Sequence, residues 1–292
     1  MRIIERTVGP ADQGRKVKYY LRSAFLLSSH QCAQLRAAEG IRVNGALARS
    51  NDLLCEGDRV QVCLPEDSPG SCVPQDDQPV NILYEDEDLL IIDKPAPLAT
   101  QFSSRNPEKM ALENRLAARY GEGFVFRPLN RLDRGTSGLL AAAKHAYACQ
   151  VLQRDLHSDR FAREYLAVVE GRLEGQGTLA FPIAKEAAAT VRRIVDFQNG
   201  KPAVTHYRAE GFYGNCTLVR LRLETGRTHQ IRLHMAHIGH PVIGDFLYGR
   251  EDPRLPGRFA LHSAALRLIH PVTGETMEWI SPLPDALRAL LS

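Results

Sequence analysis

Residues 127–140, R-P-L-N-R-L-D-R-G-T-S-G-L-L, form the stretch around which the fold is expected to be organised. A single carboxylate, Asp133, stands between Arg131 and Arg134, and small turn-forming residues then lead into an apolar run. Cations on both sides favour the ionised form of a carboxylate. Asp133 could therefore act as a nucleophile or stabilise charge at the mouth of a cleft. The simpler alternative is that it caps a turn or forms a surface ion pair.

The length and composition predict a folded protein of about two domains. The chain has 292 residues, of which 44% are hydrophobic and 24% charged. No apolar run approaches the ~18 residues of a transmembrane helix, and the first residues lack a secretory signal pattern, so we expect a cytosolic protein without membrane contact. The six cysteines form no C-x-x-C pair, which favours reduced thiols over disulfides or a zinc ribbon.

Residues 1–64 are expected to form a small basic domain, because they carry ten Lys and Arg against six Asp and Glu. Helical spacing at 17–24 and a capped helix at 30–38 precede a sheet with an Asn44-Gly45 turn and a closing strand at 58–64. Residues 65–79 hold four prolines and four acidic residues but no basic one. They are expected to be a linker that few contacts cross.

Residues 80–292 alternate between strand and helix patterns and are expected to form the second domain. The predicted helices are 106–121, begun by an Asn-Pro pair, then 145–157 and 228–238. The predicted strands are 82–84, 89–92, 139–143, 163–171, 218–223, 259–261, 265–269 and 277–280. Residues 239–249 are expected to be a packed turn and strand of the core.

The opening stretch resembles the H-R-L-D-x-x-T-S-G-L motif of the RluA-type pseudouridine synthases, which isomerise uridine within RNA. The resemblance implies that Asp133 is the catalytic aspartate. Arg131, beside it, would occupy the space of a flipped-out uridine or hold the flipped backbone. The sequence departs from the motif at Asn130, where the family most often has His; Asn130 is still expected among the substrate-binding residues, although it cannot titrate.

Further runs carry the same resemblance over about residues 82–279. L-Y-E-D-E-D-L-L-I-I-D-K-P at 83–95 is similar to the start of the family's catalytic domain. In R-E-Y-L-A-V-V-E-G, Tyr165 would be the active-site tyrosine that stacks on the target base, whereas an isolated Tyr is more often a core aromatic. In G-R-T-H-Q-I-R-L-H, Arg232 would pair with the catalytic aspartate, with Arg227 and His229 as RNA or structural contacts.

Four histidines near the last run invite a metal interpretation: His229, His234, His237 and His240. No Asp, Glu or Cys stands at metal-site spacing beside them, and the last follows the predicted helix end. This spacing disfavours a metal site, and the resemblance implies a reaction that requires neither a metal nor an organic cofactor.

The N-terminal domain resembles the S4 RNA-binding fold in S-S-H-Q-C-A-Q-L-R-A-A-E-G-I-R-V-N-G at 28–45 and in G-D-R-V-Q-V at 57–62. The opening R-K-V-K-Y-Y-L departs from that family's pattern. A small basic domain that only packs against its neighbour is the alternative.

We therefore expect an α+β protein in which a small S4-like domain (1–64) is joined by a linker (65–79) to a catalytic domain with a mixed, largely antiparallel sheet (80–292). The implied function is isomerisation of uridine to pseudouridine in RNA by a monomer. Large-subunit ribosomal RNA is the expected substrate, and transfer RNA is the main alternative. Two rivals remain: an inactive RNA-binding or ribosome-assembly factor on the same fold, and a synthase of the related RsuA type.

Overall fold

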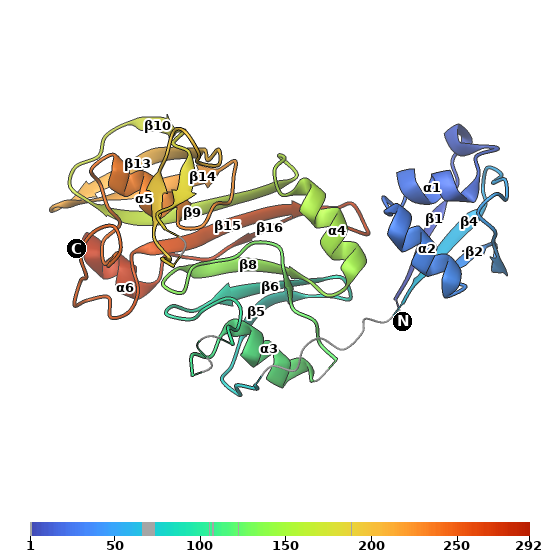
Figure 1. The fold of residues 1–292 in the computed structure, drawn as a ribbon, viewed down its shortest axis with the longest axis horizontal. Coiled ribbons are helices and arrows are strands. Elements are labelled where there is room, and N and C mark those ends of the chain that lie inside the picture. Colours follow the sequence, from blue (N-terminus) through green and yellow to red (C-terminus); the bar gives the residue numbers. More distant parts are fainter. Residues whose placement is uncertain (1, 66–73, 105, 107, 122, 188) are drawn as a thin grey trace.

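The structure is a computed structural model that describes residues 2–65, 74–104, 106, 108–121, 123–187 and 189–292. These residues build a four-stranded sheet, a ten-stranded sheet and a short hairpin (Figure 1). In the described part of the chain, no helix combines the length and apolar character that crossing a membrane requires.

The N-terminal module (residues 2–64) packs two helices on the four-stranded antiparallel sheet, in the order β1-β4-β2-β3. Its elements are β1 (Arg2–Thr7), η1 (Pro10–Asp12), α1 (Val17–Ser23), α2 (Ser29–Ala37), β2 (Ile41–Val43), β3 (Ala46–Leu47) and β4 (Arg59–Leu64). Both predicted helices, the turn and the closing strand are confirmed; Asn44 and Gly45 have φ values of 51° and 84°, as a two-residue hairpin turn requires. Strand β1 was not predicted, because its adjacent Ile3 and Ile4 hide the alternation of exposed and buried positions.

The C-terminal domain (residues 80–292) is built on the ten-stranded sheet, in the order β10-β13-β14-β9-β15-β8-β6-β5, with β16 paired to β15 and β7 to β8. Among the described residues only the β15–β8 pair is parallel, so the expected mixed, largely antiparallel α+β fold is confirmed. Its strands are β5 (Asn81–Glu85), β6 (Leu89–Lys94), β7 (Arg127–Pro128), β8 (Ser137–Ala143), β9 (Phe161–Glu170), β10 (Gln176–Leu179), β13 (Thr205–Tyr213), β14 (Cys216–Leu223), β15 (Leu261–Ile269) and β16 (Thr276–Ile280), and β11 (Ile183–Lys185) and β12 (Arg193–Val195) form the hairpin. The helices are α3 (Leu112–Tyr120), α4 (Ala146–Asp155), α5 (Gln230–His237), α6 (Asp285–Arg288) and η2 (Ala289–Leu291).

Strand β8 is buried along its whole length, which explains its continuous apolar sequence. Leu140 and Ala142 face a core that contains residues of α3, whereas Leu139 and Ala141 face a core that contains residues of α4. The strand is therefore a rigid central element, and the loop that precedes it is anchored at its end.

Three predicted elements differ in the structure. The strands expected at 259–261 and 265–269 are one continuous strand, β15, which begins at Leu261. Helix α3 begins at Leu112, not near Asn106, because the Asn114 side chain accepts a hydrogen bond from Ala111 N (2.8 Å) and so caps this later start; Pro107 lies outside the described residues. Residues 239–249 form turns with only an isolated bridge, Val242 to Val169, in place of the expected strand.

The expectation that few contacts cross between the two parts of the chain is wrong. Helix α4 has a second apolar stripe, and its Tyr147 and Val151 join the core of the N-terminal module. Gln150 Nε2 donates to Leu26 O (2.7 Å), and Arg2 donates to both carboxylate oxygens of Asp88 (2.9 Å each). The module therefore docks on the side of α4 turned away from the sheet (Figure 1). Of the proposed linker, residues 66–73 lie outside the described residues.

Asp88 holds this docking together and gives a testable acid dependence. Burial would raise the pKa of Asp88, but hydrogen bonds from His145 and Arg2 outweigh it and lower that pKa to about 2. The pKa of Asp88 is lower in the folded state than in the unfolded state, where it is about 4. The ionised carboxylate therefore stabilises the folded protein at pH values above about 4, and this stabilisation is lost as the pH falls toward 2. We expect Asp88→Asn to cost about 2 kcal/mol of unfolding free energy at pH 7 and less at pH 2, measured by urea titration.

A matched control for this variant is Glu87→Gln, which removes a neighbouring exposed carboxylate that also contacts Arg2. Surface pairs of this kind contribute about 0 to 1 kcal/mol. A cost of Asp88→Asn that is the same at pH 7 and pH 2 would contradict the assignment of the ion pair as its source.

Candidate functional site

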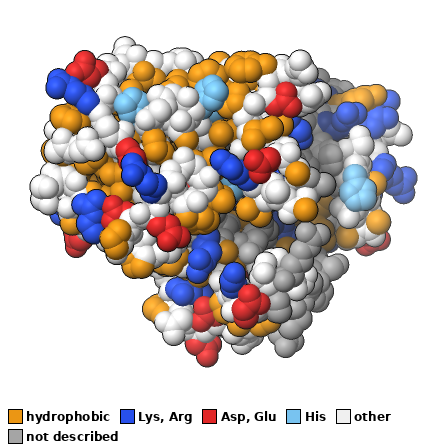
Figure 2. All heavy atoms as spheres, turned by 60° about the vertical axis from the view of Figure 1, so that its left-hand side comes forward, with side chains coloured by type: hydrophobic (Ala, Val, Ile, Leu, Met, Phe, Trp, Pro, Cys, Tyr) orange, Lys and Arg blue, Asp and Glu red, His pale blue; other side chains and the backbone are white. Residues whose placement is uncertain are grey.

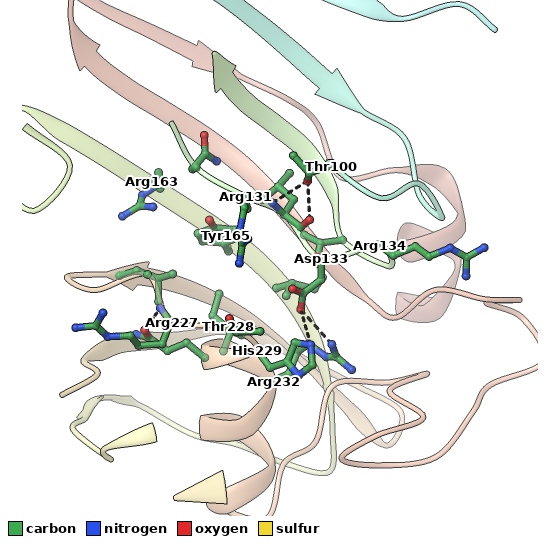
Figure 3. A pocket seen from close by; sticks show the side chains of 18 of the residues that line it. Thr100, Arg131, Asp133, Arg134, Arg163, Tyr165, Arg227, Thr228, His229 and Arg232 are labelled. Atoms are coloured by element: carbon green, nitrogen blue, oxygen red, sulfur yellow. Dashed lines mark hydrogen bonds and ion pairs between the residues drawn. The ribbon is translucent and has the colours of Figure 1, made fainter. Parts of the chain in front are cut away.

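A cleft of about 450 Å³ opens where the loop between β7 and β8 faces strand β9 and the turn before α5 (Figure 3). Among the described residues it is lined by five arginines and one carboxylate, Asp133. All seven residues that the sequence singled out line this cleft: Asn130, Arg131, Asp133, Tyr165, Arg227, His229 and Arg232.

The loop that carries Asp133 is fastened to the segment after β6. Thr100 Oγ1 donates to Leu132 O (2.7 Å) and accepts from Leu132 N (3.2 Å), and Leu98 N donates to Arg134 O (2.9 Å). Gly135 is needed next, since a Cβ there would lie 2.6 Å from the Phe259 ring. The backbone therefore presents Asp133 to the cleft from a fixed position.

Asp133 pairs with Arg232 from α5, as the sequence predicted. Arg232 Nη1 lies 3.1 Å from Asp133 Oδ2, and the Asp133 side chain remains 27% exposed. One carboxylate face is thus held by a cation while the rest of the group opens toward the cleft (Figure 3). An accessible carboxylate that is paired with a cation in this way can act as a nucleophile or stabilise a developing positive charge.

A second carboxylate, Asp245, fixes Arg232 and was not predicted. Its oxygens accept from Arg232 Nε (2.6 Å) and Nη2 (2.8 Å), and the pair is fully buried. The Phe259 ring centroid lies 4.1 Å from the guanidinium carbon. Burial opposes the charge on Arg232, but the bonds to Asp245 and the attraction of Asp133 outweigh it and raise the Arg232 pKa. Asp245 comes from the turns at 239–249 that were expected to be only core.

His229 sits beside the same pair in a left-handed conformation, with φ 58°. Its Nδ1 is 3.0 Å from Tyr248 Oη, and its Nε2 is 4.0 Å from Asp133 Oδ2. Burial lowers the pKa of His229, although Asp133 acts against this shift. The ring is therefore neutral at neutral pH and bridges the α5 turn to the aspartate.

Tyr165 is a buried side chain of β9 that faces the cleft opposite Asp133 (Figure 3). Burial raises the pKa of its phenol. The phenol therefore stays protonated at neutral pH, and its ring is available as an apolar wall for a flat ligand.

The remaining predicted residues fall into two groups. Arg131 and Arg227 are exposed at the cleft, where they can meet a polyanion. Asn130 is buried, and its side chain serves the backbone of β8: Oδ1 accepts from Ala141 N (3.0 Å) and Nδ2 donates to Leu139 O (3.4 Å). The structure therefore gives Asn130 a structural role that the sequence did not suggest.

Lys94, the lysine of the K-P run, lies fully buried beneath the Asp133 loop. Its Nζ donates to Leu98 O (2.6 Å) and Pro95 O (3.0 Å). Burial lowers its pKa to about 7, while Asp133 acts in the opposite direction. Lys94 thus holds the segment after β6, whose Leu98 N bonds the Asp133 loop at Arg134 O, and adds partial positive charge near the aspartate.

The four histidines of the metal alternative do not converge. His229 faces Tyr248, His234 bonds Phe181 O (2.9 Å), and His240 bonds Glu170 O (2.9 Å). The group of described side chains that could hold a metal is elsewhere, at Asp86, Asp88 and His270. There the carboxylates already accept hydrogen bonds from other side chains, namely Arg2, Tyr84, His145 and His270.

Comparisons with known proteins agree on one family. The family profile "RNA pseudouridylate synthase" matches residues 88–237. The chain is 38% identical over 307 residues to "Ribosomal large subunit pseudouridine synthase D" of Haemophilus influenzae, across 98% of this chain and 93% of that protein. It is 37% identical to an uncharacterised RNA pseudouridine synthase of Bacillus subtilis, across 86% and 89%. Among solved structures, "Human RNA Pseudouridylate Synthase Domain Containing 1" matches with a TM-score of 0.60 and 29% identity, across 76% of this chain and 91% of that one.

Proposed function

We propose that this chain, which belongs to the RNA pseudouridylate synthase family, isomerises uridine to pseudouridine in large-subunit ribosomal RNA with Asp133 as its catalytic carboxylate. The observation that carries the proposal is the meeting of Asp133, Tyr165 and Arg232 in one cleft, from a loop, a strand and a helix far apart in the sequence.

The chemistry requires the target nucleotide to leave its stack, because the C1′–N1 bond and the C5 atom are inaccessible inside a helix. Exposed Arg131 at the cleft mouth is placed to fill the vacated space. The base then lies against the Tyr165 ring, which suits a planar pyrimidine. Asp133 attacks or assists cleavage of the C1′–N1 bond at the sugar, and the freed uracil turns and bonds C1′ through C5. C5 then gives up its proton and N1 gains one, so the base is isomerised without net gain or loss of atoms.

Arg232 acts on Asp133 in this scheme, because its guanidinium holds and orients the carboxylate. Asp245 in turn fixes Arg232 from behind.

The choice of ribosomal RNA rests on the relatives named for the large ribosomal subunit, which are 38% identical over most of this chain. The test is pseudouridine mapping, at single-nucleotide resolution, of ribosomal and transfer RNA from a strain with and without the gene. We expect one or more large-subunit positions to lose the modification. Loss confined to transfer RNA would move the substrate to that class, and loss nowhere would favour an inactive RNA-binding factor.

We also propose that the N-terminal module is an S4-like RNA anchor and that the enzyme works as a monomer in the cytosol. The cleft is complete within one chain, which supports the monomer. On α1, Lys18 and Arg22 are four residues apart and so share a face, next to the exposed Tyr19 ring. Cations interleaved with an aromatic ring suit contact with RNA phosphates and bases.

The double substitution Lys18→Gln with Arg22→Gln tests the RNA anchor. It leaves the N-terminal module packed on α4, whereas deleting the module would expose the apolar side chains of that helix. We expect weaker RNA binding and a flatter dependence of log K on log salt, by about 0.7 for each phosphate that the protein no longer neutralises. The single-turnover rate at saturating enzyme should be unchanged, since the substitutions lie outside the cleft. Equal affinity and equal salt slopes would reduce the S4 resemblance to one of fold.

A further inference from the structure

Arg163 is a buried cation in the cleft wall that opens the R-E-Y-L-A-V-V-E-G run but received no role from the sequence. It lies on β9, two residues before Tyr165 and on the same face of the strand, and it is only 6% exposed. Figure 3 shows its guanidinium on the side of Tyr165 away from Asp133. Within the described residues its Nε has no hydrogen-bond partner, and its guanidinium carbon lies 5.5 Å from the centroid of the Phe161 ring.

Arg163 differs in its partners from Arg232, another buried arginine of the cleft. Arg232 is paired with two carboxylates, Asp133 and Asp245. Asp133 is the single carboxylate among the described lining residues, and because it is already paired with Arg232, the cleft lining offers Arg163 no carboxylate of its own. A guanidinium has five N–H donors, and burying such donors without acceptors costs free energy. The unmatched charge therefore calls for an anion that arrives with the substrate.

The surroundings of Arg163 leave room for that anion. Position 226 is glycine, and a Cβ there would lie 3.5 Å from Arg163 Nη1, so the backbone of this turn passes close to the guanidinium without a side chain to cover it. The next residue, Arg227, is exposed and lines the same cleft; its Nε donates to Pro202 O (3.1 Å), which leaves the outer nitrogens of its guanidinium for a ligand. On the face in Figure 2, basic and acidic side chains are interspersed, so this face does not present one continuous basic surface to RNA.

We propose that Arg163, with Arg227 beside it, binds a backbone phosphate of the RNA next to the target uridine. The inference rests on the proposed function, in which the base lies against Tyr165. A strand rises about 3.3 Å per residue, so Arg163 is displaced by about 7 Å along β9 from Tyr165, comparable to the separation of a base from its own backbone. The planar guanidinium fork matches phosphate oxygens in a bidentate manner. Arg163 thus positions the nucleotide and takes no part in bond making.

The test compares Arg163→Gln and Arg163→Lys with a matched control, Arg172→Gln. Arg172 is an exposed arginine just after β9 whose partner, Glu174, is also exposed. We expect Arg163→Gln to weaken RNA binding by about 10- to 100-fold, as loss of a hydrogen bond to a charged group does, and to flatten the salt slope by about 0.7. Arg163→Lys should keep the wild-type salt slope and lose less affinity. The control should match wild type.

A second arm identifies the phosphate with RNA fragments that carry one neutral methylphosphonate in turn at each linkage around the target uridine. With wild-type enzyme, one linkage should weaken binding markedly when neutralised. With Arg163→Gln that penalty should disappear, because the partner of the phosphate is gone. Penalties that are identical in the two proteins would overturn the proposal, as would an unchanged salt slope.

Two further readouts separate this role from its rivals. If Arg163 were a structural residue, Arg163→Gln would lower the melting temperature of the free enzyme; removing an unmatched buried charge should leave it equal or higher. If Arg163 acted on the base or on Tyr165, single-turnover rates at saturating enzyme would fall while affinity held. Failure of the proposed function itself is distinguishable, because wild-type enzyme would then make no pseudouridine in any fragment.

Discussion

Asp133→Asn should leave RNA binding nearly unchanged and reduce pseudouridine formation by more than about 10⁴-fold, the order lost when a catalytic carboxylate is removed. The substitution keeps the size and one oxygen of the side chain but removes the negative charge that attacks or assists at the sugar. The fold should persist, because Arg232 remains paired with the fully buried Asp245. Binding is measured by filter retention and turnover by pseudouridine detection in the same RNA.

The control for Asp133→Asn is Asp159→Asn, an exposed carboxylate outside the main cleft that pairs with Arg222. It should be indistinguishable from wild type in both assays. Measurable multiple turnover by purified Asp133→Asn protein would remove the aspartate from the mechanism. Loss of affinity together with turnover would instead point to a role in holding the RNA.

The sequence predicted the partner of Asp133 only through the family resemblance. Local charge suggested Arg131 and Arg134, which flank the aspartate, yet both are exposed, and the ion pair forms with Arg232, 99 residues away. Successive residues of a loop point in different directions, so adjacency in sequence is weak evidence for contact. The sheet order, in which β8 pairs with the much later β15, brings these segments together, and no spacing rule encodes that order.

The sequence was a poor guide where a buried residue could pack against either of two parts of the protein. On α4, Ala148 and Leu152 join the core that contains β8, whereas Val151 joins the core of the N-terminal module, and the helical spacing alone predicts only that these positions are buried. A helix with two apolar stripes shows which residues are buried, not which stripe meets which partner. Asn130 and Asp245 were similarly ambiguous. The residue type alone does not tell whether a buried polar side chain bonds to the backbone, to a ligand or to a charged partner.

Arg232→Met should be the most damaging single change in the cleft, because it unpairs two carboxylates at once. Asp245 is fully buried, and breaking a buried ion pair from one side typically costs about 3 to 5 kcal/mol. We therefore expect a large drop in the denaturation midpoint as well as loss of activity. On its own, this outcome would not separate a role in folding from a role in catalysis.

The double variant Arg232→Met with Asp245→Asn separates the two roles. Removing the buried negative charge together with its cation restores neutrality behind the cleft, so most of the lost stability should return. Activity should not return, because Asp133 still lacks the guanidinium that lies 3.1 Å from it. Denaturation midpoints and single-turnover rates of wild type, both single variants and the double variant form the complete cycle. Recovery of activity with stability would show that Arg232 serves only the fold, and that Asp133 works without a paired cation.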